Sequence, residues 1–201
     1  AVADPSGNLF VAVGNAEGAG FNYGNSVIRL TPELAEADYW APTDWQALNY
    51  SDTDVGSITP ELLMDGLVFQ AGKAGIGYLI NESKLGGIGG EVFSARVCNG
   101  LDYGGVAYAP HFLYVPCRGI GVTALRLGAN RFDVAWKAGG GGNTPVVAGG
   151  WPWTIGGSAL VQVALDPGAV QSRIPLPVAA AFAPVSPRYG CLCGPAGSAS
   201  I

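Results

Sequence analysis

The sequence has few charged residues and a single histidine, and both scarcities exclude classes of function. Only 12% of its 201 residues are charged, and the ten lysine and arginine residues are scattered singly along a chain of net charge −5. Proteins that follow a phosphate backbone use a clustered basic patch, so we expect no nucleic-acid binding. Because His111 is the only histidine, an HExxH metal site is impossible and any Ser-His-Asp triad would depend on this one residue. We expect His111 to be an ordinary strand-end residue.

The chain also lacks a long apolar segment. Its longest, residues 174–185, is interrupted by prolines and is shorter than the roughly 18 residues of a membrane-spanning helix. Residues 1–10 have neither a basic start nor an apolar core, so they do not resemble a signal peptide. We expect no membrane segment and no signal peptide in this chain, and we expect further sequence upstream of it.

Glycine and repetition, by contrast, are abundant. Glycine accounts for 32 residues, well above its average share of about 7%. One short apolar phrase, centred on an aromatic residue and bounded by turn residues, occurs at 8–15, 66–73, 111–118 and 150–157. Each phrase is followed by a second strand-like run, at 26–32, 76–82, 122–128 and 161–167. The repeat therefore predicts one β-hairpin that is used four times.

Further strand-like segments extend each hairpin on both sides. Small-residue segments precede the last three phrases, at 56–63, 104–110 and 143–149, and suit crowded innermost strands. Outer strands are expected at 38–42, 91–97, 132–138 and 169–177. A repeat of about 40 residues with four short strands is typical of a β-propeller blade. The sequence thus predicts an all-β protein with about four four-stranded antiparallel blades and no long helix.

The predicted blades lie near 1–42, 56–97, 104–138 and 143–177, and the first is expected to lack its inner strand. A fifth unit is expected to start at Phe182, with 188–201 as an irregular or truncated tail. Propellers close with typically four to eight blades. An open half-ring would expose apolar blade faces, so we expect either closure with four blades or a homodimer that completes an eight-blade ring.

The four cysteines leave two interpretations open. Cys98 ends an outer strand and Cys117 ends the phrase of the next blade, so the two could form a disulfide. Alternatively, all four are small buried apolar residues. Cys191 and Cys193 are too close in sequence for the cysteine pairs of a structural zinc site, so no zinc site is expected.

Polar residues that could carry chemistry gather at strand ends of the first two blades. Asn15 closes the first phrase, Asp52 and Asp54 precede an innermost strand, and Lys73 closes the second phrase. Equivalent strand ends of adjacent blades point to the same mouth of a propeller. Amide and carboxylate oxygens suit Ca²⁺, and an ammonium group pairs with an organic anion. The alternative is that these residues only form turns.

Three segments, 4–15 (DPSGNLFVAVGN), 51–60 (SDTDVGSITP) and 72–81 (GKAGIGYLIN), resemble signatures of the pyrroloquinoline quinone (PQQ) dehydrogenase-like propellers. The resemblance implies a half of the eight-bladed quinoprotein fold and an exported or periplasmic protein. It also implies that Asn15 is a Ca²⁺ ligand, that Asp52 is the base that removes the alcohol proton, and that Lys73 contacts the quinone. Asp54 would match a second carboxylate near the metal.

The sequence also departs from that family. Ser51 stands where its alcohol dehydrogenases usually carry tryptophan, and no two cysteines are adjacent. Three functions therefore remain as hypotheses. The first is a Ca²⁺-dependent and PQQ-dependent oxidoreductase that acts on alcohols or sugars, in partial or impaired form. The second is a non-enzymatic propeller scaffold that binds a small ligand or a partner. The third is a Ca²⁺-dependent lactonase or related hydrolase.

Overall fold

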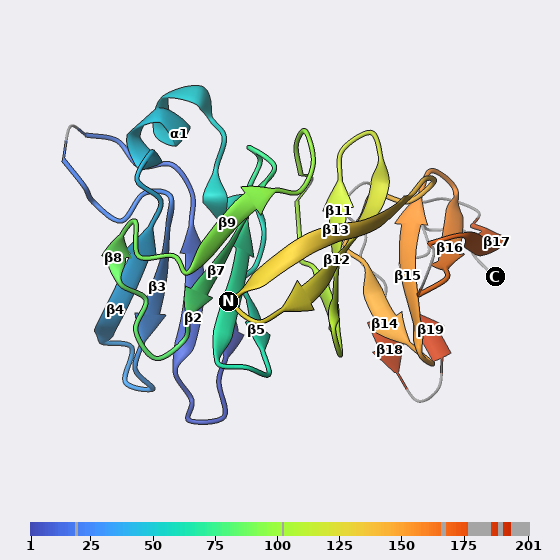
Figure 1. Cartoon of the computed structure of the whole chain (residues 1–201), viewed down its shortest axis with the longest axis horizontal. Helices are drawn as coiled ribbons and strands as arrows, with labels where there is room; N and C mark the ends of the chain where they lie inside the picture. Colours follow the sequence, from blue (N-terminus) through green and yellow to red (C-terminus); the bar gives the residue numbers. More distant parts are fainter. Residues whose placement is uncertain (19, 102, 166–167, 177–185, 189–190, 194–201) are drawn as a thin grey trace, which may run out of the picture. The chain divides into compact units, whose positions relative to one another are not determined.

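The computed structural model describes residues 1–18, 20–101, 103–165, 168–176, 186–188 and 191–193 (Figure 1). The chain divides into two compact units. The first contains residues 1–101 and 129–131, and the second contains the described residues of 102–128 and those from 132 onward.

The first unit contains two sheets. One has the order β1 (Val2–Ala3), β2 (Leu9–Val13), β3 (Ser26–Leu30), β4 (Glu36–Ala41) and β8 (Gly87–Ile88). The other has the order β5 (Glu61–Leu63), β6 (Leu67–Ala71), β7 (Ile76–Asn81) and β9 (Phe93–Arg96). The short helix α1 (Trp45–Ser51) and the 3-10 turn η1 (Val55–Ser57) lie between the two sheets in sequence.

The second unit contains two four-stranded sheets and one two-stranded sheet. The four-stranded sheets are β10 (Ala107–Ala109), β11 (Phe112–Cys117), β12 (Gly121–Gly128) and β13 (Arg131–Ala138), followed by β14 (Val146–Ala148), β15 (Trp151–Gly156), β16 (Ala159–Val163) and β17 (Val170–Pro175). The strands β18 (Ser186–Arg188) and β19 (Cys191–Cys193) pair with each other in antiparallel fashion.

Four strands follow one another in sequence order within each blade, from inner to outer, and pair antiparallel wherever the register is recorded. The predicted four-blade β-propeller-like fold is thereby confirmed. The helix α1 has seven residues, which agrees with the expectation of no long helix. The predicted start of the fifth unit at Phe182 lies outside the described residues, as does most of the predicted tail, but the antiparallel pair of β18 and β19 lies within the stretch predicted for them.

Two details of the first blade differ from the prediction. Its inner strand is present, because Val2 of β1 pairs with Phe10 of β2 across the 4–8 turn. Its outer edge is also longer than expected. The short strand β8 pairs with β4 in parallel, with Trp40 opposite Gly87 (Figure 1). Both additions are two-residue strands.

The aromatic residues of the first three phrases are buried at the centre of their blades, whereas Trp153 of the fourth is partly buried. Phe10, Phe69 and Tyr114 are each 0% exposed. In the first unit Phe10 packs in a cluster with Val27 and Trp40, among others. All five residues of β6 are buried, because both faces of this strand are covered. The repeat therefore reflects a recurring core position, since large buried side chains dominate the hydrophobic stabilisation of each blade.

The turn between the inner strand and the next strand needs a left-handed backbone in each blade. Glycine holds this conformation at Gly7, Gly66 and Gly150, with φ of 86°, 70° and 79°. His111 holds it in the third blade, with φ of 71°. The sequence predicts an ordinary strand-end position for His111. In the structure His111 lies in the turn before β11, in a backbone conformation that disfavours a side chain.

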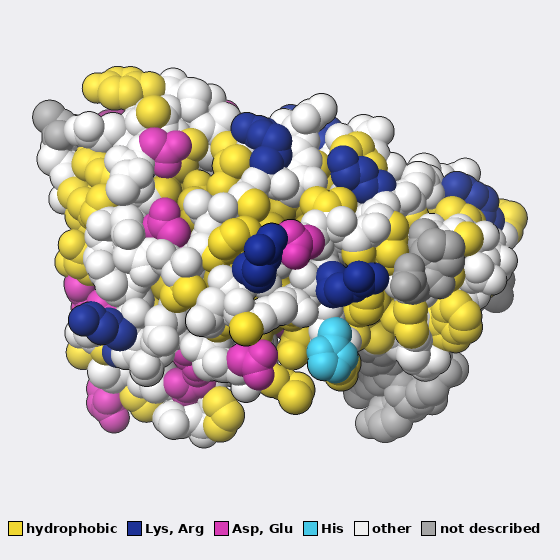
Figure 2. All heavy atoms as spheres, in the orientation of Figure 1, with side chains coloured by type: hydrophobic (Ala, Val, Ile, Leu, Met, Phe, Trp, Pro, Cys, Tyr) yellow, Lys and Arg dark blue, Asp and Glu magenta, His cyan; other side chains and the backbone are white. Residues whose placement is uncertain are grey.

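Cys98 and Cys117 are both disulfide-bonded and buried. None of the described helices has the length and apolar character needed to cross a membrane. On the face shown in Figure 2, lysine and arginine side chains lie singly between polar and apolar surface. This face therefore offers no basic patch, and the absence of nucleic-acid binding stays a prediction.

Candidate functional site

Glycines at strand ends bring the backbones of the first two blades into contact. Gly14 follows β2, Gly56 lies in η1, and Gly72 follows β6. A Cβ atom on Gly56 would collide with the backbone of Gly14, and a Cβ atom on Gly72 would collide with the carbonyl oxygen of Asp54. The side chains that follow these glycines are therefore forced close together.

The four residues singled out in the sequence meet at this point. The backbone N–H of Asn15 donates to Asp54 Oδ1 at 3.0 Å, and Asn15 Nδ2 donates to Asp52 Oδ1 at 3.0 Å. Lys73 Nζ donates to Asp52 Oδ1 at 3.2 Å and forms an ion pair with Asp54 Oδ2. We call Asn15, Asp52, Asp54 and Lys73 the ion-pair cluster. Their proximity was predicted correctly, whereas their chemical roles stay predictions.

The two ion pairs of the cluster differ in burial. The side chains of Lys73 and Asp54 are 14% and 16% exposed, whereas the side chain of Asp52 is 79% exposed. The hydrogen bond that Lys73 donates to Asp54 raises the pKa of Lys73 well above its ordinary value, and Asp52 adds to this effect. Water screens the pair with Asp52, so the Asp54–Lys73 pair carries most of the stabilisation.

Local backbone geometry fixes both aspartates. Asp52 terminates α1 in the left-handed conformation, with φ of 53°, and its N–H donates to the carbonyl of Leu48. Aspartate is one of the few residues that adopt this conformation readily. Asp54 contacts Lys73 through its side chain and also through its backbone, because its carbonyl oxygen accepts the backbone N–H of Lys73 at 2.9 Å.

A second set of polar residues, which the sequence analysis missed, supports the cluster. Asn25 is fully buried, and its Nδ2 donates to Asn15 Oδ1 at 3.1 Å and to Asn49 Oδ1 at 2.7 Å. Its Oδ1 accepts the backbone N–H of Val55 at 2.8 Å. The available signal was the Gly-Asn dipeptide at 24–25, which repeats the one at 14–15.

Gln70 fixes the same region from β6. It is fully buried in an otherwise apolar strand, and its Nε2 donates to the carbonyl oxygens of Val55 at 2.8 Å and Ile58 at 3.0 Å. These bonds satisfy its Nε2, whereas its buried Oε1 has no hydrogen-bond partner among the described residues. Gln70 thus holds the η1 segment, and with it Asp54, against the second blade.

The donor set of the cluster does not fit a Ca²⁺ ion. Calcium takes six to eight oxygen ligands. The Asn15 side chain offers Asp52 an N–H group, its oxygen is bonded to Asn25, and both carboxylates face the ammonium group of Lys73. Among the described residues, no group of three or more His, Cys, Asp and Glu side chains could hold a metal. The lysine supplies the positive charge between the carboxylates.

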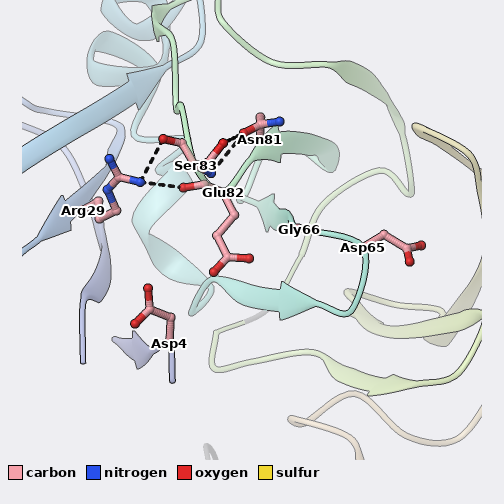
Figure 3. Close-up of a pocket in the computed structure, with 7 residues that line it drawn as sticks. All are labelled: Asp4, Arg29, Asp65, Gly66, Asn81, Glu82 and Ser83. Atoms are coloured by element: carbon pink, nitrogen blue, oxygen red, sulfur yellow. Dashed lines mark hydrogen bonds between the residues drawn. The ribbon is translucent and has the colours of Figure 1, made fainter. Parts of the chain in front are cut away.

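Two of the cavities lined by described residues lie in the first unit. One, of about 390 Å³, is lined by Asp4, Arg29, Asp65, Gly66, Asn81, Glu82 and Ser83 (Figure 3). Arg29 donates there to the carbonyl oxygens of Glu82 at 2.9 Å and Ser83 at 3.0 Å. Asp4 closes its own turn, and the side-chain hydrogen bond from Asn8 lowers its pKa. The Asp65 carboxylate points away from the carboxylates of Asp4 and Glu82 (Figure 3). Asp4 thus serves its own turn, Arg29 holds the loop after β7, and the carboxylates do not converge on one point.

The other cavity, of about 350 Å³, lies beside the ion-pair cluster. It is lined by residues 16–18, which follow β2, and by Trp45, Gln46, Asn49 and Tyr50 of α1. We call it the α1 cavity. Asn49 links it to the cluster, because Asn49 Oδ1 accepts both the backbone N–H of Ala16 at 3.2 Å and the Asn25 side chain.

No protein-family profile and no curated protein matches the sequence. Several solved structures are similar in fold. BamB from Moraxella catarrhalis superposes with a TM-score of 0.57 and 12% identity over 75% of this chain and 44% of its own. The C-terminal WD40 domain of Sif2 superposes with a TM-score of 0.49 and 11% identity over 86% of this chain and 48% of its own. A protein of unknown function from Bacteroides caccae superposes with a TM-score of 0.48 and 14% identity over 82% of this chain and 61% of its own.

The chain thus spans less than two thirds of each of these structures. At these identities the likeness concerns the fold alone. BamB supports the β-propeller architecture and says nothing about the quinoprotein family.

Proposed function

We propose that the chain is a non-enzymatic β-propeller scaffold that binds a small ligand or a partner through the loops beside α1. The supporting observation is that the ion-pair cluster is closed on itself. Asp52 Oδ1 accepts from both Asn15 and Lys73, and Asp54 is bonded to Asn15 and Lys73. Residues that satisfy one another hold strand ends together and have few remaining contacts for a substrate.

The physical role of the cluster in this proposal is to join the first two blades. A hydrogen bond to a charged group contributes roughly 1.5–3 kcal/mol to stability. The Asp54–Lys73 pair is mostly shielded from water, so it lies in this range, while the Asp52 contact contributes less. The cluster thus keeps α1 and the loop after β2 in place and so supports the α1 cavity.

The convergence of Asn15, Asp52 and Lys73 favours a second candidate, the Ca²⁺-dependent and PQQ-dependent oxidoreductase. PQQ, if bound, would supply a quinone able to take up hydride from an alcohol, and Ca²⁺ would supply the polarisation of that quinone. In that case Asp52 would take the alcohol proton and Lys73 would contact the quinone. Lys73 would first have to release both carboxylates. The lactonase hypothesis needs the same metal, and no further observation favours it.

One titration separates the two candidates. The absorption spectrum of PQQ is recorded in CaCl₂ with increasing amounts of protein, followed by addition of a primary alcohol or glucose. The Lys73→Met variant is the control. We expect no protein-dependent change in the spectrum and no reduction of the quinone. A stoichiometric spectral change followed by reduction of the quinone on addition of the alcohol or glucose, both abolished in Lys73→Met, would instead establish the oxidoreductase.

We also propose that the protein functions in an oxidising compartment, such as the periplasm or the cell exterior. The supporting observation is that Cys98 and Cys117 are disulfide-bonded, since disulfides persist mainly in such compartments. Thiol titration of the protein taken directly from its native source tests this. Free thiols at both positions would contradict it.

A further inference from the structure

The α1 cavity has one rigid wall. Trp45 is 8% exposed and packs edge-on against Phe21, with ring centroids 5.3 Å apart. Phe21 is in turn stacked on Tyr39 at 5.1 Å. Aromatic contacts of this kind hold side chains in fixed orientations. The Trp45 side of the cavity is therefore formed before any ligand arrives.

A second aromatic ring among the lining residues is exposed. Tyr50 is 91% exposed at the C-terminal end of α1. It therefore contributes almost nothing to the core of the unit. Exposed aromatic side chains beside a cavity are typical of binding sites, because they offer a large contact area with little loss of side-chain entropy.

The charge of the cavity is negative. Glu17 is exposed and lines it, and no lysine or arginine is among its lining residues. Glu17 forms no ion pair with any residue that the structure describes. The whole chain has a net charge of −5, so its field also attracts cations.

Two aromatic rings and a carboxylate around one cavity form the arrangement that recognises an organic cation. The faces of tryptophan and tyrosine attract ammonium and guanidinium groups. We propose that the α1 cavity binds an organic ammonium or guanidinium cation that contacts the lining rings of Tyr50 and Trp45 and pairs with Glu17. This inference rests on the proposed binding function and names its ligand class. The cation belongs either to a free amine or to a lysine or arginine side chain of a peptide.

Calorimetric titration with matched probes tests the ligand class. Choline, agmatine and N-acetyl-lysine methylamide are the cationic probes, and 3,3-dimethyl-1-butanol is the neutral isostere of choline. We expect the cationic probes to bind and the neutral isostere to bind at least about tenfold more weakly, because only a cation gains from the rings and the carboxylate. Tighter binding of the lysine derivative than of choline would point to a peptide.

Two variants connect the binding to the cavity. Glu17→Gln and Tyr50→Ala alter exposed side chains, so both should fold, and unchanged melting curves verify this. We expect each to weaken the cationic probes by about 3-fold or more, since an exposed cation–π contact is worth roughly 0.5–1 kcal/mol. Equal affinity for the neutral isostere would overturn the inference on charge while leaving the scaffold proposal in place. Binding unaffected by both variants, or no binding of any probe, would overturn the inference itself.

Discussion

Replacing Glu61 with glutamine is expected to stabilise the protein above neutral pH. Glu61 lies on β5, the inner strand of the second blade, opposite Phe69 of β6. Burial raises the pKa of its carboxyl group from 4.5 to about 7. Among the described residues no hydrogen bond or ion pair to this carboxyl is recorded. The group is therefore more costly to ionise in the folded protein than in the unfolded chain.

The sign and the size of the effect follow from the two pKa values. Below pH 4.5 the carboxyl group is protonated in both states and carries no penalty. Between pH 4.5 and about 7 the unfolded chain ionises first, so stability falls as the pH rises, and above pH 7 the full penalty applies. At about 1.4 kcal/mol per pH unit this amounts to about 3 kcal/mol, which partial contact with water reduces to about 2 kcal/mol.

Urea unfolding of the parent and of Glu61→Gln at pH 5, 6, 7 and 8 measures this difference. We expect the variant to gain about 2 kcal/mol at pH 8 and progressively less toward pH 5. Glu33→Gln, at an exposed position, is the control and should show no such trend. A stability difference that does not depend on pH, or a variant that is less stable at pH 8, would refute the reasoning.

Three further predictions concern backbone and assembly. His111→Gly should stabilise the protein by about 1 kcal/mol in urea unfolding, because the left-handed turn disfavours a side chain; a loss of stability would show that the imidazole makes a needed contact. Gly72→Ala should destabilise by more than about 3 kcal/mol, since its Cβ would strike the Asp54 carbonyl, whereas Gly20→Ala, with open space around it, should be nearly neutral. Similar melting temperatures for the two glycine variants would refute this. Sedimentation equilibrium should report either a compact monomer or a dimer, and larger open-ended assemblies would contradict both.

The strand order was predictable because it repeats. Four hairpins with an aromatic centre place Phe10, Phe69 and Tyr114 at equivalent buried positions, and such periodic burial is visible in a sequence. The meeting of Asp54 and Lys73 was predictable for a related reason, since equivalent strand ends of neighbouring blades lie together. The glycines at 14, 56 and 72 allow the close approach.

The missed elements are those that depend on tertiary contacts. The strands β1 and β8 have two residues each, too few to show a periodic pattern. The helix α1 has seven residues, no side-chain cap from Asp44, and no acidic residue in its first turn, so the usual start signals are absent. Residue types at a site also do not reveal partners. The sequence pointed to ligands for a metal, whereas the structure pairs the carboxylates with Lys73.

The central claim is that the ion-pair cluster holds the first two blades together and is not a metal site. Melting curves of the parent, Lys73→Met and the exposed control Lys84→Met, each in CaCl₂ and in EDTA, test it most directly. We expect identical parent curves in both solutions. We also expect that Lys73→Met melts about 4–8 °C lower, as a loss of about 2 kcal/mol implies for a chain of this size, while Lys84→Met is unchanged. A parent that melts at a lower temperature in EDTA, or a Lys73→Met variant as stable as the parent, would contradict the account.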